Sequence, residues 1–134
     1  MPPTPTGAAC GPAKPELAER PLLSPEQAAE LQGLFKVLGS DSRLRLLHAL
    51  ARAGELCVSD LAATVAMSPQ AVSNQLQRLV DRRIVAFRRA GSNVYYRLVD
   101  PCVPGLLDLG LCLLEDAGRL PQPDAAPAGV GVGR

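Results

Sequence analysis

The feature that most constrains the fold is the stretch ELCVSDLAATVAMSPQAVSNQLQRLVD at residues 55–81. The spacing of its apolar residues predicts a short helix near 58–65 and a longer helix from 69 to about 81, with a break of three residues between them. Ser68 is a favourable N-cap for the second helix, and Pro69 takes the first helical position, where proline is tolerated. A short helix, a tight turn and a second helix form a helix-turn-helix.

Two more helices are predicted before the helix-turn-helix. The first covers residues 25–38 and opens with SPEQ, the pattern of a capping box followed by apolar residues at helical spacing. The second is capped by Ser40 or Asp41 and ends just before Gly54. We expect the buried face of this second helix to consist of Leu44, Leu47, Leu50 and Ala51.

The residues that follow the helix-turn-helix predict a β-hairpin and a final helix. The stretch IVAFRRAGSNVYYRL at residues 84–98 alternates as two strands do and has a turn at 90–93. A hairpin directly after a helix-turn-helix is a wing. The last helix is predicted to start near Cys102 and to end near Gly118. The expected fold is therefore mainly α-helical with a small β-hairpin, a winged helix-turn-helix.

The two ends of the chain are rich in proline, alanine and glycine. We expect residues 1–22 and 120–134 to be disordered tails, which leaves one domain at 23–119 in a chain of 134 residues. The chain has no run of eighteen apolar residues and no signal-peptide pattern at its start, so we expect a cytoplasmic protein without a membrane partner. With one histidine and no glycine-rich phosphate loop, we expect neither an enzyme nor an organic cofactor.

Three blocks of the sequence, ELCVSDLA, SPQAVSNQLQRL and GSNVYYRL, stand in the order and spacing typical of one bacterial family. Through them the chain resembles the ArsR/SmtB family of small dimeric winged-helix repressors, over roughly residues 24–116. The resemblance implies a homodimer that binds double-stranded operator DNA. It also implies that a metal, a metalloid or an oxidant releases the protein from that DNA.

Basic residues gather on the second helix of the helix-turn-helix and on the wing. Residues 78–97 hold six arginines and a single acid, Asp81, although the formal net charge of the chain is only +1. Such a cluster favours DNA, with arginines on phosphates and with polar side chains of the helix on base edges. The expected DNA-binding residues are Ser68, Gln70, Ser73, Asn74, Gln77, Arg78, Arg88 and Arg89. For Gln77, plain solvation is an equally good interpretation.

The last predicted helix carries two thiols, Cys102 and Cys112, among many leucines. The resemblance implies that this helix builds the dimer interface. Free cysteine is often buried and behaves as a small apolar residue, so both thiols can simply be part of this interface. The leucines expected between subunits are Leu106, Leu107, Leu109, Leu111, Leu113 and Leu114.

Carboxylates beside these thiols favour a second interpretation. Zinc-sensing proteins of the family place Asp-x-His near the start of this helix and His-x-x-Glu near its end, and different subunits supply the two halves. Here Asp100 and Cys102 resemble the first half. Cys112 and Glu115 resemble the second, with one residue fewer in between. About 15 Å separates two cysteines ten residues apart on a helix, so they can share an ion only across the dimer.

Two thiolates with carboxylates favour a soft ion such as cadmium, lead, zinc or arsenite as the regulatory ligand. A second candidate metal site pairs Cys57 with Cys10. In other relatives ELCVCDLA supplies two thiols, but Ser59 replaces the second one here. Cys57 can equally be packed in the interior, and Cys10 incidental.

Two alternatives to an ion sensor remain open. In the first, the protein is a redox-sensing or persulfide-sensing repressor of the same fold, whose cysteines form a disulfide across the dimer. In the second, the winged helix binds another protein and its cysteines are inert. The six arginines near the wing favour DNA over this second alternative.

Overall fold

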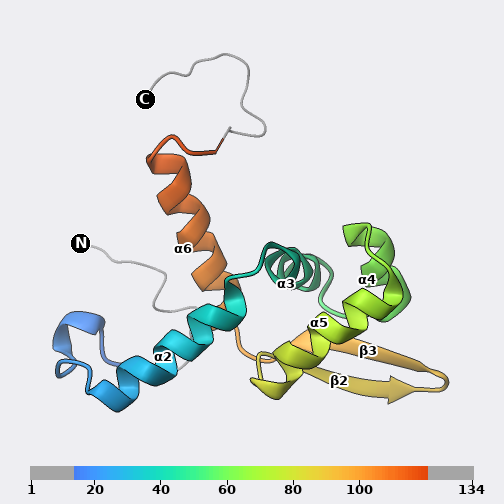
Figure 1. Cartoon of the computed structure of the whole chain (residues 1–134), viewed down its shortest axis with the longest axis horizontal. Coiled ribbons are helices and arrows are strands. Elements are labelled where there is room, and N and C mark those ends of the chain that lie inside the picture. The colour runs from blue at the N-terminus through green and yellow to red at the C-terminus, as the bar shows by residue number, and fades with distance from the viewer. Residues whose placement is uncertain (1–13, 121–134) are drawn as a thin grey trace.

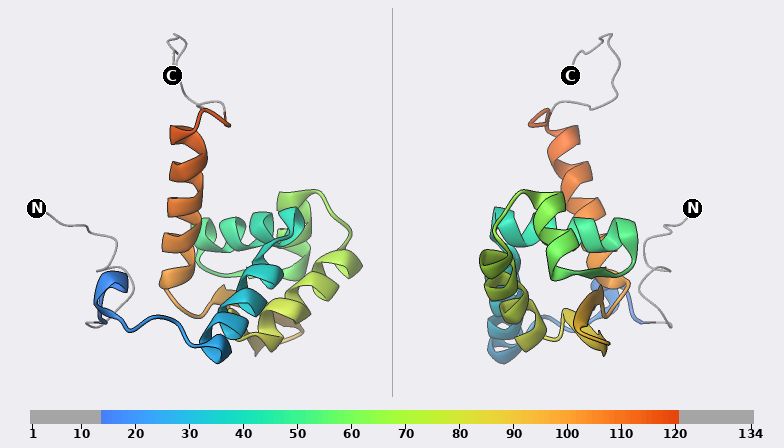
Figure 2. Two further views of the ribbon diagram at one scale, coloured as in Figure 1. Left: turned by 60° about the vertical axis from the view of Figure 1, so that its left-hand side comes forward. Right: turned by 90° about the vertical axis from the view of Figure 1, so that its right-hand side faces the viewer.

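The computed structural model describes residues 14–120 of the chain. In chain order the elements are η1 (Leu17–Glu19), α2 (Pro25–Leu38), α3 (Asp41–Ala53), β1 (Leu56–Cys57), α4 (Val58–Val65), α5 (Pro69–Asp81), β2 (Val85–Ala90), β3 (Asn93–Leu98) and α6 (Cys102–Asp116). Helices α3, α4 and α5 gather beside the small sheet, whereas α6 projects away from this body (Figures 1 and 2). The predicted order of helices and hairpin is confirmed.

Side-chain caps explain where the helices start. Ser24 accepts a hydrogen bond from the backbone N–H of Gln27 at 3.1 Å, and the Gln27 side chain accepts one from the Ser24 N–H at 3.0 Å. This is the predicted capping box. Ser40 caps α3, and Ser68 caps α5 by accepting a hydrogen bond from the Ala71 N–H at 3.1 Å. These contacts satisfy N–H groups that have no partner within the helix.

The turn of the helix-turn-helix is made without glycine. Ala66 ends α4 in the left-handed conformation, with φ 57° and ψ 49°. A guanidinium nitrogen of Arg45 on α3 donates a hydrogen bond to the Val65 carbonyl at 2.8 Å. Because the last carbonyls of a helix lack partners within it, this bond helps to hold the turn against α3.

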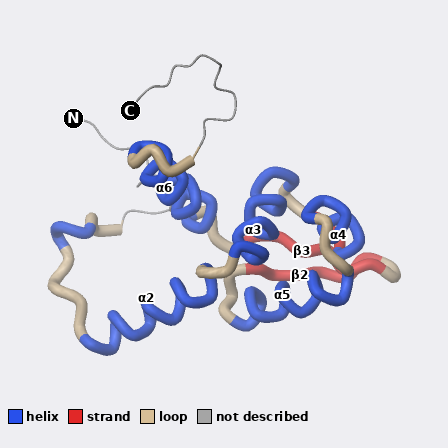
Figure 3. The backbone as a smooth tube through the Cα atoms, turned by 45° about the horizontal axis from the view of Figure 1, so that its top comes forward, coloured by secondary structure: helices blue, strands red, loops and turns tan. Residues whose placement is uncertain are grey.

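The sheet has three strands in the order β1–β3–β2, one more than the predicted hairpin. Figure 3 shows β2 and β3 side by side. The additional strand β1 is only two residues long and pairs antiparallel with β3, Leu56 opposite Tyr96 and Cys57 opposite Tyr95. No alternating pattern can be recognised over two residues, so sequence reasoning missed this strand. It joins the wing to the start of the helix-turn-helix.

The core lies where α3, α4 and α5 meet the sheet. Its members are Leu38, Leu46, Leu47, Ala49, Leu50, Leu61, Ala62, Val65, Val72, Leu76, Leu79, Ile84 and Val85. The predicted buried face of α3 was partly wrong, because the structure buries Leu46 and Ala49 and leaves Leu44 37% exposed and Ala51 exposed. Helix α3 contacts α2, α4, α5, α6 and β3. Its buried face is therefore wider than the single helical stripe predicted from the sequence, and it is centred on a different side of the helix.

The predicted tails are described only in part. Residues 14–22 include the short helix η1, in which Glu16 and Glu19 form a capping box. Residues 1–13 and 121–134 lie outside the described part of the chain. Among residues 14–120, the structure has no helix long and apolar enough to cross a membrane.

Candidate functional site

Helix α5 presents a polar stripe on the side opposite its buried residues. Gln70, Asn74 and Gln77 are exposed, and Ser73 is half-buried beside them. The Gln70 amide donates a hydrogen bond to the Asn74 side chain at 3.1 Å, and the Gln77 amide donates one to Asp81 at 2.9 Å. The stripe therefore combines exposed amides, which can hydrogen-bond base edges, with the carboxylate of Asp81, which was not among the expected DNA-binding residues.

The two wing arginines expected at DNA point to opposite faces of the sheet. Successive side chains alternate along a strand, and paired residues share a face. Arg89 is opposite Val94 and lies on the face of Phe87 and the buried Val85. Arg88 is opposite Tyr95 and lies on the other face. The two guanidinium groups therefore lie on opposite sides of the wing, and DNA on one side of the hairpin cannot contact both of them equally.

Arg88 is held by two neighbours. Its Nε and Nη2 donate hydrogen bonds of 2.8 Å each to the two carboxylate oxygens of Glu55, and its guanidinium stacks over the Tyr95 ring at 5.0 Å. The hydrogen bond from Arg88 lowers the pKa of Glu55 below its ordinary value. Sequence reasoning missed this pair because Glu55 stands 33 residues before its partner. Among residues 14–120, Arg89 forms no ion pair.

A second arginine from the basic cluster also belongs to the scaffold. Arg82 lies 3.8 Å from Glu30 of α2, and its guanidinium covers Gly33, where an added methyl group would collide with it. Arg82 therefore ties the end of α5 to α2. Arg78, in the last turn of α5, is exposed.

The two thiols of α6 lie at opposite ends of the helix. Cys102 is half-buried at its first residue, and its backbone N–H donates a hydrogen bond of 2.7 Å to Asp100, which lowers the pKa of that carboxyl. Cys112 is exposed. Within residues 14–120 of one chain, no group of three or more His, Cys, Asp or Glu could hold a metal ion.

The carboxylate in contact with Cys112 is Asp116, one turn further along α6. The Cys112 Sγ lies 3.8 Å from an Asp116 oxygen, whereas Glu115, the residue expected from the resemblance, is half-buried beside it. The charge of Asp116, then desolvation and the charges of Glu115 and Asp108, raise the pKa of the Cys112 thiol above its ordinary value. In a helix, residues four apart share a face, which explains this contact.

The raised pKa of Cys112 predicts slow alkylation. A raised pKa leaves less thiolate at neutral pH, and thiolate is the nucleophile, so the rate should still be rising as the pH passes the ordinary cysteine range. Asp116→Asn should lower this pKa and speed the reaction with iodoacetamide, followed peptide by peptide by mass spectrometry. Asp108→Asn is the matched control with a smaller effect. An unchanged rate in Asp116→Asn would contradict the assigned cause.

Cys57 stands at the junction of β1 and α4, half-buried. Its Sγ lies 3.3 Å from the Ser59 hydroxyl and donates a hydrogen bond to Asp60 at 3.4 Å. Its suggested partner, Cys10, lies outside the described residues. The structure therefore describes only one thiol of the second candidate site.

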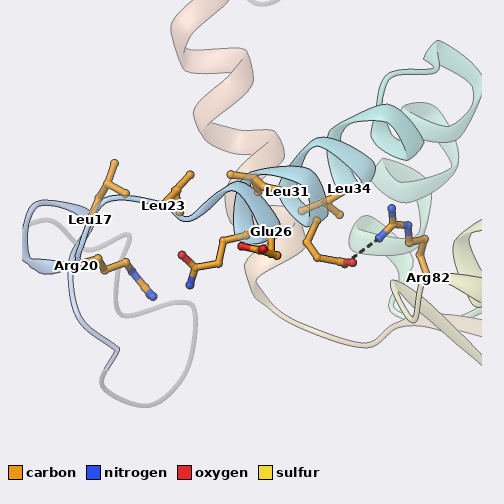
Figure 4. Close-up of a pocket in the computed structure, with 9 residues that line it drawn as sticks. Leu17, Arg20, Leu23, Glu26, Leu31, Leu34 and Arg82 are labelled. Atoms are coloured by element: carbon orange, nitrogen blue, oxygen red, sulfur yellow. Dashed lines mark ion pairs between the residues drawn. The ribbon is translucent and has the colours of Figure 1, made fainter.

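Two apolar surfaces are left uncovered in the single chain. One is an open groove of about 680 Å³ between η1 and α2 (Figure 4), lined by Leu17, Leu23, Leu31 and Leu34 with charged residues at its edge. The other is the projecting half of α6, whose exposed leucines are Leu109, Leu111, Leu113 and Leu114. The first half of α6 packs against the core instead.

These elements define the class of the protein as a winged helix-turn-helix, and comparisons with known proteins define its family. Residues 40–86 match bacterial regulatory proteins of the arsR family. A transcriptional repressor SmtB homolog from Synechocystis is 49% identical over 85 residues, 63% of this chain and 64% of that protein. The crystal structure of the antimony-specific transcriptional repressor AntR matches with a TM-score of 0.69 and 60% identity, over 82% of this chain and 99% of that chain.

The chain belongs to the arsR family of bacterial regulatory proteins. A homodimeric winged helix-turn-helix DNA-binding domain from Mycobacterium bovis also matches, with a TM-score of 0.61 and 29% identity over 72% of this chain and 91% of that one. The match to the Synechocystis homolog spans slightly less than two thirds of the length of that relative.

Proposed function

We propose that the protein is a homodimeric transcriptional repressor, which binds operator DNA and releases it when its cysteines bind a soft metal or metalloid ion. The observation that carries the DNA-binding part is the exposed polar stripe of α5 beside a basic wing. Membership in a family of regulatory proteins supports the same conclusion.

In this proposal α5 enters the major groove of the DNA. Gln70, Ser73, Asn74 and Gln77 are available to base edges, and the hydrogen bond between Gln70 and Asn74 limits their freedom before DNA is bound. The N-terminus of α5, which the Ser68 side chain caps, faces a phosphate of the DNA. Arg78 and Arg89 supply phosphate contacts, whereas Arg88 takes part only as a pair with Glu55.

The two uncovered apolar surfaces support the dimer. A monomer that exposed the leucines of α6 and the groove beside α2 would leave a large apolar area in water, which marks interaction surfaces. The match to a homodimeric DNA-binding domain supports a second copy as the partner. Dimers of this kind place their two reading helices, here α5 of each protomer, in successive major grooves.

The regulatory site is proposed at α6, across the dimer. Each end of the helix offers one thiol beside one carboxylate, Cys102 with Asp100 and Cys112 with Asp116 or Glu115. Neither end of α6 alone has enough metal ligands. The Cys102 end of one protomer and the Cys112 end of the other together supply two thiols with carboxylates. This donor set suits a thiophilic ion, which would hold the two protomers in one relative orientation when bound.

Arsenite and antimonite are the first ions to test, followed by cadmium, lead and zinc. The 60% identity to a repressor described as antimony-specific favours the trivalent metalloids. The raised pKa of Cys112 does not separate ion binding from the redox alternative, because the thiolate is both the metal ligand and the species that oxidants attack. Cys57 and Cys10 remain the second candidate site.

Replacing side chains of the two proposed DNA surfaces should give different defects. Arg89→Ala should weaken binding to all duplexes alike and lower the slope of log affinity against log salt by roughly one unit. Asn74→Ala should weaken operator binding selectively, by about 1–3 kcal/mol. Fluorescence anisotropy over a range of salt concentrations measures both. Lys36→Ala, which removes an exposed cation from α2, is the control, and normal binding by Arg89→Ala would contradict the role of the wing.

A further inference from the structure

Glu55 lies on the short connection between α3 and β1 and reaches the wing across the sheet. Both of its carboxylate oxygens bind Arg88, which lies over the Tyr95 ring on the outer face of the hairpin. The pair therefore spans the sheet, from the segment that leads into β1 to the outer strand β2. It is one of two arginine–carboxylate ion pairs in residues 14–120.

Folding stability does not explain this pair well. Both groups are in contact with water, with side-chain exposures of 52% for Arg88 and 29% for Glu55, and exposed ion pairs contribute little to stability. Its electrostatic consequence is larger, because it cancels one cation of the wing. The guanidinium uses two of its five N–H groups on Glu55, whose carboxylate takes the place that a phosphate would otherwise occupy at these donors.

We propose that Glu55 is an internal competitor of the DNA backbone, which occupies the guanidinium of Arg88 and so lowers the affinity of the protein for DNA. This inference rests on the proposed DNA-binding function. A carboxylate in a bidentate pair offers arginine the same planar arrangement of oxygens as a phosphate does. While Arg88 is paired with Glu55, the two side chains approach DNA without a net charge. The pair therefore displaces few counterions from the duplex.

Such a limit on affinity serves a repressor that an ion must release. Coupling between a ligand and DNA typically changes affinity by 5-fold to 150-fold. If the ion-free protein bound its operator much more tightly, the ion-bound protein would still occupy a large fraction of the operator sites. Glu55 therefore sets the affinity at which ion binding can empty the operator.

The test is Glu55→Gln, which keeps the size of the side chain and removes its charge. Arg88 then becomes available to a phosphate, so affinity for operator and random duplexes should both rise, by about eightfold at 0.1 M salt for one added contact. The slope of log affinity against log salt should become steeper by about 0.9. Unchanged or weaker binding would overturn the proposal, since weaker binding would mean that Glu55 orients Arg88 for its contact.

The double variant Glu55→Gln/Arg88→Gln shows whether the effect runs through Arg88. In the Arg88→Gln background, Glu55→Gln should change neither affinity nor salt slope. A persistent increase would instead assign Glu55 a general repulsion of DNA. The matched control Asp41→Asn removes the same charge from the first turn of α3, outside the groove and α6, and should leave the slope unchanged. If wild type and variant both fail to bind any duplex, the proposed function itself is wrong, whereas binding by wild type with no gain in the variant refutes only the role of Glu55.

Discussion

Serine in place of either Cys102 or Cys112 is expected to abolish the release of operator DNA by arsenite or antimonite. Each proposed site needs Cys102 of one protomer and Cys112 of the other, so each single variant disrupts both sites of the dimer. DNA binding without the ion should be unchanged, because both thiols lie on α6 rather than on the reading helix or the wing. Operator binding measured by anisotropy, and the thiolate-to-metal absorption band, should lose their response together.

A mixed dimer of the two serine variants separates a shared site from one within a single chain. One of its pairings unites both intact cysteines and the other unites both serines, so it should regain one ion per dimer. Cys57→Ser is the control and should keep the full response. If both serine variants of α6 still leave the operator on addition of the ion, α6 is only a dimer interface, and Cys57 and Cys10 become the sites to test.

Leu113→Glu is expected to separate the protomers and abolish operator binding. Leu113 is 67% exposed in the single chain, so the charge should disturb the fold of one protomer little. In the proposed dimer it would be buried without a partner for its charge, which costs several kcal/mol. A protomer with one reading helix cannot span two half-sites, so operator affinity should fall toward that for random DNA, by about 10³-fold or more.

Light scattering after gel filtration measures the mass of the Leu113→Glu protein, and circular dichroism shows whether its helices are intact. Val99→Glu is the control, because Val99 is also exposed and apolar, at 52%, but lies outside α2 and α6. It should remain a dimer. A dimeric Leu113→Glu protein with normal operator binding would show that the projecting half of α6 is not the interface.

The sequence alone determined the five longer helices, the hairpin and their order, because the signals for these are local. Ser24 and Ser68 bond to N–H groups three residues further on, and such a cap can be recognised from its neighbours in the chain. The alternating pattern of the hairpin and the helical spacing of α5 act over similarly short distances. The exposed polar stripe of α5 was predicted for the same reason, since a helix with one apolar face must present the other to water.

The three-dimensional arrangement decided which side chains are buried and which side chains from distant parts of the chain meet. Strand β1 forms only because β3 lies beside it, and Glu55 meets Arg88 only because the sheet brings together residues 33 positions apart. The buried face of α3 depends on the five elements that contact it, so Leu46 and Ala49 replace two of the predicted core residues.

The same distinction applies to the thiols. The sequence placed Cys102 and Cys112 at the two ends of one helix, and helical rise keeps them about 15 Å apart. The structure showed that Asp116 contacts Cys112 and raises its pKa, through a position one turn further along the same face. Contacts between residues distant along the chain depend on how whole elements pack, and residue spacing within one element cannot determine that packing.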